Sequence, residues 1–365
     1  MNILYITALP GLVSAGPSWS IPASIQAQNK IDNCLWVNVT DRCLEHWKKV
    51  ECYHNIKEFA AKFELSVMPI PFNHPDLVVF EDFYELQPPL IARELRRAHI
   101  PYVIVPRGAL TNKAQNNRSR WKKIVANAIL FKAYAEKAMA IQFLTMNEAK
   151  SVGLSWNKRH FILPNGITPP KAIKQSFSPD GINATFIGRL DIFQKGIDIL
   201  IQACAESSND LRAANFNLHI YGPHNKDYEL IQTMIRANKL VDIVFLEDET
   251  SGKDKEKVIL GTDLFVLTSR FEGHPMGLIE ALAYGVPAIV TPGTNMADEI
   301  AKSDAGWVCN EASADAIKTQ LQNVLKERFI LANKGANAAK LAKKYDWDVL
   351  AENFHKEVKQ ILATL

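Results

Sequence analysis

The stretch of residues 270–291, RFEGHPMGLIEALAYGVPAIVT, decides the fold. It combines a polar loop, a short apolar helix at 278–284 and a strand at 288–291, and an apolar strand at 264–268 lies just before it. Strands that alternate with short helices in this way are typical of a parallel sheet flanked by helices. We therefore predict an α/β fold whose ligands bind at loops beyond the carboxyl ends of the strands.

The same alternation continues on both sides of this stretch. Residues 169–179, PPKAIKQSFSP, interrupt it with three prolines and suit a linker between domains. We expect a doubly wound domain at 1–170, a linker at 171–179, a second doubly wound domain at 180–345 and a C-terminal segment at 346–365 with a helix at 349–364. Further strands are expected at 3–7, 78–80, 102–105, 141–144, 161–163, 184–188, 218–221 and 244–246. Further helices are expected at 21–30, 118–140, 197–206 and 227–238.

Length and composition agree with two globular domains. The chain has 365 residues, of which 47% are hydrophobic and 22% charged. No run of 18 apolar residues predicts a membrane span, and the start, MNILYITALPG, is typical of a first strand rather than of a signal peptide. The five cysteines contain no C-x-x-C pair, which favours free thiols. We expect a cytoplasmic protein.

Charge is concentrated in one part of the chain. Residues 93–174 hold 16 Lys and Arg against 3 Asp and Glu, a net charge of +13 in a chain whose total is +3. Such asymmetry indicates an anionic partner, which includes phosphate groups, a membrane surface or nucleic acid.

Two glutamates eight residues apart are the first candidates for chemistry. Glu272 follows a strand in the loop, and Glu280 lies within the apolar helix. A carboxylate in a buried helix needs a partner, because an unpaired buried charge is costly. The partner of Glu280 is either a cation on a neighbouring strand or a ligand hydroxyl such as that of a ribose, and the pattern leaves both open.

Three further segments favour an anionic ligand. Pro275, Met276 and Gly277 lead into the helix, and free amides at a helix N-terminus favour a diphosphate. In the segment Gly188-Arg189-Leu190-Asp191 and the following Lys195-Gly196, the two cations are either phosphate ligands or solvated surface residues. The early loop, residues 16–20, contains glycine but does not match G-x-G-x-x-G, so the sequence gives no support for dinucleotide binding.

These motifs occur together and in order along nearly the whole chain. They are GRLDIFQKG at 188–196, the Glu272/Glu280 pair in EGHPMGLIEALAYGVPAIVT, PNG at 164–166 and AGPSWSIP at 15–22. In this combination the chain resembles the retaining nucleotide-sugar glycosyltransferases of glycosyltransferase family 4. The resemblance implies the GT-B fold, in which two Rossmann-like doubly wound domains face each other across a cleft.

The resemblance also implies roles for individual residues. Arg189 and Lys195 are expected to hold the donor diphosphate, Glu272 to face the transferred sugar and Glu280 to bind the ribose hydroxyls. The catalytic residues are thus Glu272, Arg189 and Lys195, and the donor-binding set is Gly16, Gly188, Arg189, Lys195, Glu272, Met276, Gly277, Leu278 and Glu280. The sequence departs from the family at Ala15, where a second glycine is common, and at Arg107, where many members carry histidine. Arg107 and Ser18 are candidates for contacts to the sugar or acceptor.

The implied reaction transfers a hexose or related sugar from a UDP- or GDP-sugar to a glycan or lipid-linked acceptor, in surface polysaccharide synthesis. No cofactor and no metal are expected, since the cations and a helix N-terminus supply positive charge to the leaving diphosphate. The Asp-x-Asp match at Asp346 and Asp348 is interpreted as the N-cap of the last helix. That helix is expected to return to the first domain.

Two other functions compete with this one. A nucleotide-sugar epimerase of the same fold would need acid and base carboxylates in the first domain, and the sequence indicates no such constellation there. A non-catalytic nucleotide-sugar-binding paralogue would not need the cations and glutamates named above.

Two clusters outside these motifs have less specific patterns. Cys43, His46, Cys52 and His54 fit neither usual zinc spacing. The basic residues of the predicted helix 118–140 border an apolar stripe; these cations are Arg118, Arg120, Lys122, Lys123, Lys132 and Lys137. No nucleic-acid motif accompanies them. We interpret this helix as a contact to an anionic membrane surface or a lipid-phosphate acceptor, which predicts a peripheral location on the inner face of the membrane.

Overall fold

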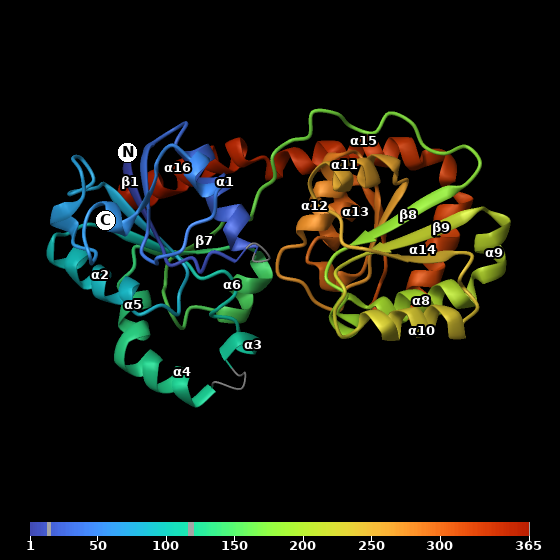
Figure 1. Ribbon diagram of the computed structural model, residues 1–365, viewed down its shortest axis with the longest axis horizontal. Helices are drawn as coiled ribbons and strands as arrows, with labels where there is room; N and C mark the ends of the chain where they lie inside the picture. Colours follow the sequence, from blue (N-terminus) through green and yellow to red (C-terminus); the bar gives the residue numbers. More distant parts are fainter. Residues whose placement is uncertain (13–15, 116–119, 365) are drawn as a thin grey trace. The chain divides into compact units, whose positions relative to one another are not determined.

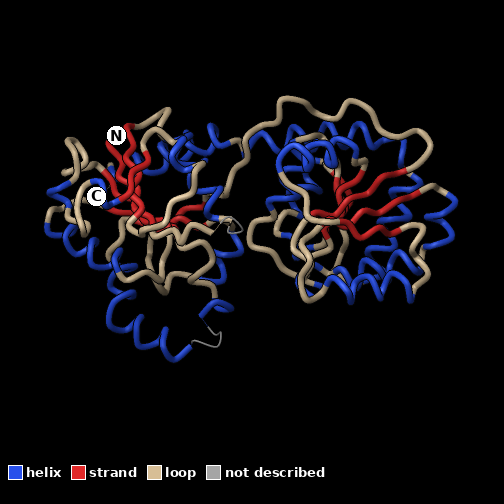
Figure 2. Tube along the Cα trace, viewed as in Figure 1, coloured by secondary structure: helices blue, strands red, loops and turns tan. Residues whose placement is uncertain are grey.

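The computed structural model describes residues 1–12, 16–115 and 120–364, without the side chains of residues 112, 113 and 120–122. The chain forms two units (Figures 1 and 2). The first comprises residues 1–166 and the C-terminal segment from Trp347, and the second comprises Ile167–Asp346. Ala15 and Arg118, both singled out in the sequence, lie outside the described residues.

The first unit is built on a parallel sheet of seven strands among the described residues, in the order β3-β2-β1-β4-β5-β6-β7. The strands are β1 (Asn2–Thr7), β2 (Asn33–Asn38), β3 (Tyr53–Asn55), β4 (Leu77–Glu81), β5 (Tyr102–Val105), β6 (Ala140–Phe143) and β7 (His160–Ile162). The helices are α1 (Pro17–Gln28), α2 (Gln87–Arg97), α3 (Asn112–Gln115), α4 (Arg120–Ala126), α5 (Lys132–Glu136), α6 (Met146–Val152) and α16 (Trp347–Leu362).

Residues of this sheet alternate between two apolar clusters, because successive side chains of a strand point to opposite faces. Ile3 and Tyr5 of β1 join a cluster that includes Ile21 of α1 and Phe354 of α16. Leu4 and Ile6 join the opposite cluster, which contains the buried residues of α2 and α5. Helices therefore cover both faces, so the central residues of the long strands are apolar.

The second unit repeats this plan with six parallel strands among its residues, in the order β10-β9-β8-β11-β12-β13. The strands are β8 (Ile182–Ile187), β9 (Phe216–Tyr221), β10 (Val244–Glu247), β11 (Leu264–Leu267), β12 (Ala288–Val290) and β13 (Gly306–Val308). The helices are α7 (Ile192–Lys195), α8 (Ile197–Glu206), α9 (Ser208–Ala213), α10 (Tyr228–Ala237), α11 (Gly252–Gly261), α12 (Met276–Ala283), α13 (Ala297–Ser303), α14 (Ala314–Lys326) and α15 (Leu331–Ala342).

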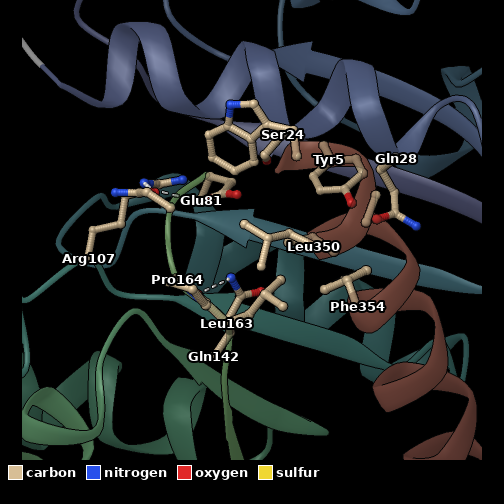
Figure 3. Close-up of a pocket in the computed structure, with 14 residues that line it drawn as sticks. Tyr5, Ser24, Gln28, Glu81, Arg107, Gln142, Leu163, Pro164, Leu350 and Phe354 are labelled. Carbon is tan, nitrogen blue, oxygen red and sulfur yellow. Dashed lines mark hydrogen bonds and ion pairs between the residues drawn. The ribbon is translucent and has the colours of Figure 1, made fainter. Parts of the chain in front are cut away.

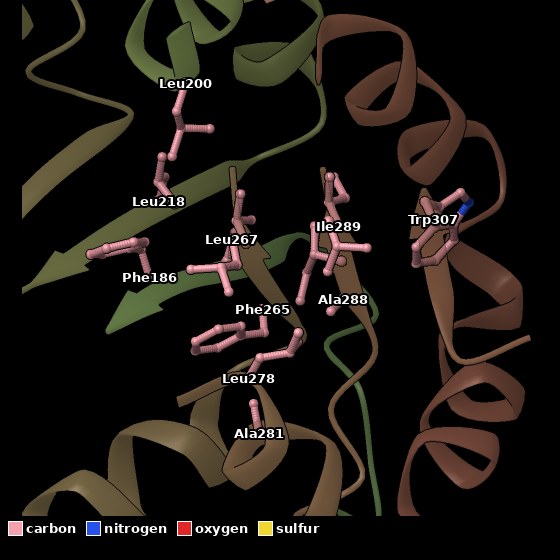
Figure 4. Close-up of a cluster of buried hydrophobic side chains, with 14 of the residues drawn as sticks. Phe186, Leu200, Leu218, Phe265, Leu267, Leu278, Ala281, Ala288, Ile289 and Trp307 are labelled. Atoms are coloured by element: carbon pink, nitrogen blue, oxygen red, sulfur yellow. The ribbon is translucent and has the colours of Figure 1, made fainter. Parts of the chain in front are cut away.

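The core of the second unit fixes the position of α12. Leu278 and Ala281 of α12 lie on the side of the sheet to which Phe265 of β11 points, while Leu200 of α8 lies beside Leu218 on the opposite side (Figure 4). All five side chains are completely or almost completely buried. The short apolar helix predicted from residues 270–291 is thus an internal helix that sets the loop before it.

The predicted helix 118–140 differs in the structure. Its described part is divided into α4, a π-helical turn at Asn127–Phe131 (η4) and α5, which ends at Glu136. The predicted apolar stripe is also only partly buried, since Phe131 lies in the core but Ile124 and Val125 are 44% and 56% exposed. Ala140 begins strand β6 instead of ending the helix.

The segment predicted as a linker, residues 171–179, is anchored on the second unit. Lys174 Nζ lies 3.1 Å from Asp263 Oδ1, and both side chains are almost completely buried. The last helix, α16, belongs to the first unit, where it packs against α1 and Lys30 Nζ lies 2.6 Å from Asp348 Oδ1. Within the described part of the chain, no helix combines the length and apolar composition that a membrane crossing requires.

Candidate active site

The strand orders place the predicted site loops at the ligand-binding edge of each sheet. In each unit the direction of chain progression reverses at one point, between β1 and β4 in the first sheet and between β8 and β11 in the second. Ligands of doubly wound sheets bind beyond the carboxyl ends of the strands at such a point. Gly188 and Arg189 directly follow β8, and Glu272 lies in the loop after β11. The sequence motifs therefore flank the reversal in the second unit.

The loop after β8 is held in a defined shape. Asp191 caps α7 by accepting a hydrogen bond from the Gln194 amide at 2.7 Å. Gly196 follows with φ of +65° and separates α7 from α8. The Thr268 hydroxyl donates to the carbonyls of Lys195 and Gly196, at 3.1 Å each. This arrangement joins the loop after β8 to the end of β11.

Replacement of Gly196 by Ala is expected to lower the free energy of unfolding of the second unit by roughly 2 kcal/mol or more. A Cβ atom there would lie 2.2 Å from the Thr268 carbonyl oxygen, and the left-handed backbone disfavours any side chain. Urea unfolding measures the change. Gly261→Ala is the matched control, because nothing lies within 4 Å of its new Cβ and α11 ends there. Equal stability of both variants would contradict the expectation.

Lys195 and Glu272 meet across the reversal point. Lys195 Nζ lies 2.5 Å from Glu272 Oε1, and the exposed fractions of the two side chains are 12% and 7%. The Ser269 hydroxyl donates to the same carboxylate oxygen at 2.5 Å. Asn295 donates to the Glu272 main-chain carbonyl at 2.6 Å and so supports the loop from the segment after β12. The structure thus brings together two of the three predicted catalytic residues.

The third predicted catalytic residue, Arg189, lies in the loop after β8, where its exposed guanidinium is 3.4 Å from Gln194 Oε1. A second arginine was not predicted. Arg270 makes a bidentate ion pair with Asp198, with both N···O distances 2.7 Å. Its Cζ atom lies 4.8 Å from the centre of the Phe193 ring. Arg270 is therefore engaged within the protein, and Arg189 has the cationic group that a ligand can reach.

The first turn of α12 contains the predicted backbone donors. The Met276 amide donates to the His274 carbonyl and the Leu278 amide to the Pro275 carbonyl, at 3.0 Å each. A Cβ on Gly277 would lie 3.1 Å from the Ile187 carbonyl oxygen, so the atom nearest to this glycine is the end of β8. The close approach brings the start of α12 beside the Gly188 loop.

Glu280 differs from the expectation of a fully buried carboxylate. Its side chain is 32% exposed, and it forms an ion pair with Lys255 of α11. The sequence interpretation had offered a cation on a neighbouring strand, and the partner lies on a helix instead. The exposed remainder of the carboxylate is the part that a ribose could contact.

His274 lies in the loop between Glu272 and α12. Its Nδ1 atom is buried and lacks a hydrogen-bond partner among the described residues. Burial lowers the pKa of this imidazole to about 4. The ring is therefore neutral at physiological pH, and the nearby Tyr345 ring packs against it at 5.5 Å between centroids.

In the first unit, Gly16 stands at the start of α1, directly before Pro17. Nothing lies within 4 Å of a Cβ built on Gly16, so the surface there is open to a ligand. Ser18 is completely buried, and its carbonyl accepts hydrogen bonds from His46 and Trp47 at 2.8 Å. A direct contact between the Ser18 hydroxyl and a ligand would require movement of this turn.

Arg107 is held inside the first unit. Its Nε donates to Glu81 Oε2 at 2.9 Å, and the exposed fractions of the two side chains are 8% and 4%. The same guanidinium donates to Ser20 Oγ at 3.2 Å and to Asn165 Oδ1 of the PNG motif at 3.1 Å. Arg107 and Glu81 line one end of a small polar pocket that Tyr5 and other side chains close (Figure 3). The arginine at the family's histidine position thus makes a buried ion pair.

The first unit contains buried carboxylates that the sequence pattern did not indicate. Asp82 follows Glu81 at the end of β4 with φ of +128°, and burial raises the pKa of its carboxyl to about 6. Glu148 accepts hydrogen bonds from the Gly108 and Leu144 amides at 2.6 and 2.9 Å, and burial raises its pKa as well. Glu148 lies in α6, far along the chain from Glu81 and Asp82 at the end of β4, so the sequence pattern did not connect them.

The residues of the unusual zinc spacing have other partners. His46 stacks on Trp19 with ring centroids 4.0 Å apart, and His54 pairs with Glu58 at 2.8 Å. Among the residues that the structure describes, no group of His, Cys, Asp and Glu side chains could hold a metal ion.

A comparison with protein-family models assigns the second unit. Residues 170–344 match the family described as glycosyl transferases group 1. These residues form a group 1 glycosyltransferase domain. The family match and the second unit have nearly the same bounds, so Lys195, Glu272 and Glu280 all lie within the group 1 domain.

Curated relatives are similar over parts of the chain. A putative colanic acid biosynthesis glycosyltransferase, WcaL of Salmonella typhimurium, is 24% identical over 35% of this chain and 32% of its own length. Mannosylfructose-phosphate synthase of Agrobacterium fabrum is 30% identical over 33% of this chain and 27% of its own length. The matched stretches thus span about a third of the length of these relatives.

Solved structures extend the similarity to both units. HepE of Anabaena in complex with UDP has a TM-score of 0.73 with 14% identity, over 99% of this chain and 100% of its own. The lipopolysaccharide outer core galactosyltransferase WaaB has a TM-score of 0.69 with 18% identity, over 99% of each chain. At these identities the likeness establishes the fold, and the chain has the two Rossmann-like units of the GT-B fold, as predicted.

Proposed function

We propose that the protein is a retaining glycosyltransferase that moves a hexose or related sugar from a UDP- or GDP-sugar to a glycan or lipid-linked acceptor. The contact between Lys195 and Glu272, inside a group 1 domain and across the point of strand reversal, is the observation that carries this proposal. A cation next to a carboxylate at this edge of the sheet suits a donor whose diphosphate and sugar bind there together.

The arrangement suits departure of a nucleoside diphosphate. Negative charge grows on the diphosphate as its bond to the sugar breaks, and fixed cations lower the energy of that state. Lys195 is held by Glu272 and Ser269, whereas Arg189 is exposed and free to close on a phosphate. In the proposed complex the Glu272 carboxylate would face the sugar, where positive charge develops. The relatives named as polysaccharide-synthesis enzymes support a role in surface polysaccharide synthesis.

A donor screen tests the proposal directly. Thermal unfolding is measured with UDP-sugars and GDP-sugars, since a ligand at 100 times its Kd adds about 2.7 kcal/mol of stability. The donor that stabilises the protein is then tested for transfer to candidate acceptors, with the anomeric configuration of the product read by NMR. Product with inverted configuration would contradict retention, and no response to any nucleotide sugar would contradict the donor class.

Substitutions of the two glutamates are expected to change different kinetic constants. Glu280→Gln should mainly raise the donor KM, because a ribose contact is equally strong in the ground and transition states. Glu272→Gln should mainly lower kcat, because its charge faces the reacting sugar. Both constants are measured at saturating acceptor. Lys255→Gln serves as a control for the loss of the Glu280 ion pair, and a reversal of the two patterns would exchange the two roles.

Activity is expected without a divalent metal. Lys195, Arg189 and the start of α12 supply positive charge to the diphosphate, and Asp346 and Asp348 lie at the start of α16 in the sequence rather than in a donor loop. The assay compares turnover in EDTA with turnover in added Mg²⁺ or Mn²⁺. A reaction that EDTA abolishes and metal restores would count against a cation-only site.

The epimerase alternative gains one observation from the structure. Asp82 has an unusual backbone conformation and a raised pKa at the end of β4, which are features of acid-base groups. Glu81 and Glu148 are less suited, since an arginine and two amides hold them. Conversion of the donor without an acceptor would favour the epimerase, and tight donor binding without turnover would favour a non-catalytic paralogue.

The membrane-surface interpretation is retained for α4. Ile124, Val125 and Ile129 are exposed on α4 and η4, in the part of the chain with excess basic charge. Apolar side chains beside cations suit an anionic membrane surface, and we propose that an acceptor on a lipid phosphate is met there. The side chains of Arg120 and Lys122 lie outside the described residues.

A further inference from the structure

A second, basic pocket lies at the edge of the first sheet opposite to Gly16 and Arg107. It has a volume of about 760 Å³ and is bordered by the residues that lead into three successive strands. Pro101 precedes β5, Met139 precedes β6 and Arg159 precedes β7. The pocket is therefore at the amino-terminal ends of these strands, whereas Gly16, Arg107 and Asp82 follow the carboxyl ends.

The lining of this pocket carries an excess of positive charge. Arg96 from the last turn of α2, Lys137 after α5, and Lys158 and Arg159 before β7 all line it. Across the described parts of the chain, none of these four cations forms an ion pair. The one carboxylate in the lining, Glu136, lies 3.4 Å from Lys132 Nζ.

This pocket accounts for charge that the active site does not use. All four cations belong to residues 93–174, the segment with a net charge of +13. The predicted basic helix face explains less of that excess than expected. Lys123 donates to the Ala114 carbonyl at 2.5 Å, and Lys132 lies over the Trp156 ring.

A purely structural explanation covers only half of these cations. Arg96 and Lys137 lie at helix C-termini, where positive charge is stabilising without any ligand. Lys158 and Arg159 follow no helix, since they precede β7 after the loop at 153–157. Four unpaired like charges around one hollow repel one another, and a bound anion relieves that repulsion.

The loop that presents Lys158 and Arg159 is fixed by a buried side chain. Asn157 donates to the carbonyls of Ala135 and Ala138 at 2.8 and 2.9 Å, and accepts from the Arg159 amide at 2.8 Å. Every one of these bonds is within the first unit. The pocket is therefore a preformed feature of the fold, and its cations need little reorganisation to meet a ligand.

We propose that this pocket binds a phosphate-bearing anion. Arginine and lysine together suit phosphate oxygens, Arg as a planar fork and Lys as a point charge. The volume is within the range of sites that take ligands larger than a single ion. The phosphate belongs either to a soluble molecule or to a lipid headgroup, and in both cases the site is separate from the proposed donor site.

Pyrophosphate is the probe for a soluble ligand, titrated by calorimetry at low and high salt. Every protein carries Arg189→Ala and Lys195→Ala, so that the proposed donor site does not contribute. Arg96→Gln with Arg159→Gln should weaken pyrophosphate binding at least tenfold. Arg93→Gln with Arg97→Gln removes the same charge from exposed positions of α2 and should change it less than twofold.

The lipid source is tested by sedimentation of the same two variants with vesicles of phosphatidylglycerol, which is anionic, or of phosphatidylcholine, which is neutral. Loss of pyrophosphate binding in the pocket variant alone assigns a soluble phosphate. If no protein binds pyrophosphate and only the pocket variant loses its binding to phosphatidylglycerol vesicles, the ligand is a lipid headgroup. If neither probe distinguishes the pocket variant from the α2 control, or neither binds at all, the proposal is overturned.

Discussion

Replacement of Arg107 by Ala is expected to lower the free energy of unfolding of the first unit by about 3–5 kcal/mol. The substitution removes the partner of Glu81, whose side chain is 4% exposed, and leaves an uncompensated charge inside the fold. It also breaks hydrogen bonds to Ser20 and Asn165. Urea unfolding followed by tryptophan fluorescence reports mainly on this unit, because six of the seven tryptophans belong to it.

Two controls separate burial from charge in this experiment. Lys30→Ala removes a cation from an exposed ion pair with Asp348 on the same unit, and should cost less than about 1 kcal/mol. Arg107→Met combined with Glu81→Leu removes both charges and should recover most of the loss. If Arg107→Ala leaves stability unchanged and raises only the acceptor KM, the residue is a ligand contact, as its place in the family pattern implies.

The sequence predicted those strands best that form continuous apolar runs. Strands β1, β4, β5 and β11 are buried on both faces, and each contains an uninterrupted run of four apolar residues. Strand β2 was not predicted although its residues 34–37 form an equally apolar run, and β13 (Gly306–Val308) was not predicted although β7 and β12 are as short. Neither the length of a strand nor its composition alone therefore decides whether the sequence reveals it.

Contacts between residues far apart in the chain could not be predicted from the sequence. The order of motifs located Lys195 and Glu272 in separate loops, but their contact joins residues 77 positions apart and depends on β8 lying beside β11. Glu280 was expected to need a partner, yet nothing in the local pattern selected Lys255. The charge of residues 93–174 was likewise evident as a sum, while the grouping of four of these cations around one pocket depends on how the ends of three strands lie together.

Lys195→Ala is expected to lower kcat at least tenfold, and Arg189→Ala should do the same. Each removes a charge-assisted contact to the leaving diphosphate, and loss of one such donor in other enzymes costs about a hundredfold or more. The two variants should differ in stability. Lys195 is 12% exposed and pairs with Glu272, so its loss should also destabilise the second unit, whereas Arg189 is exposed and should not. Initial rates at saturating donor and acceptor, with urea unfolding of each variant, measure both effects.

Lys334→Ala is the matched control for Lys195→Ala. Lys334 is a similarly buried lysine of the same unit, and its Nζ lies 2.5 Å from Asp304 before β13, at the edge of the sheet away from the donor loops. Its removal should destabilise the unit while kcat of the folded enzyme stays within about twofold, because no developing charge is near it. If Lys334→Ala lowers kcat as much as Lys195→Ala, the loss reflects stability alone. If Lys195→Ala and Arg189→Ala both keep the wild-type kcat and donor KM, the donor diphosphate does not bind at the loop after β8.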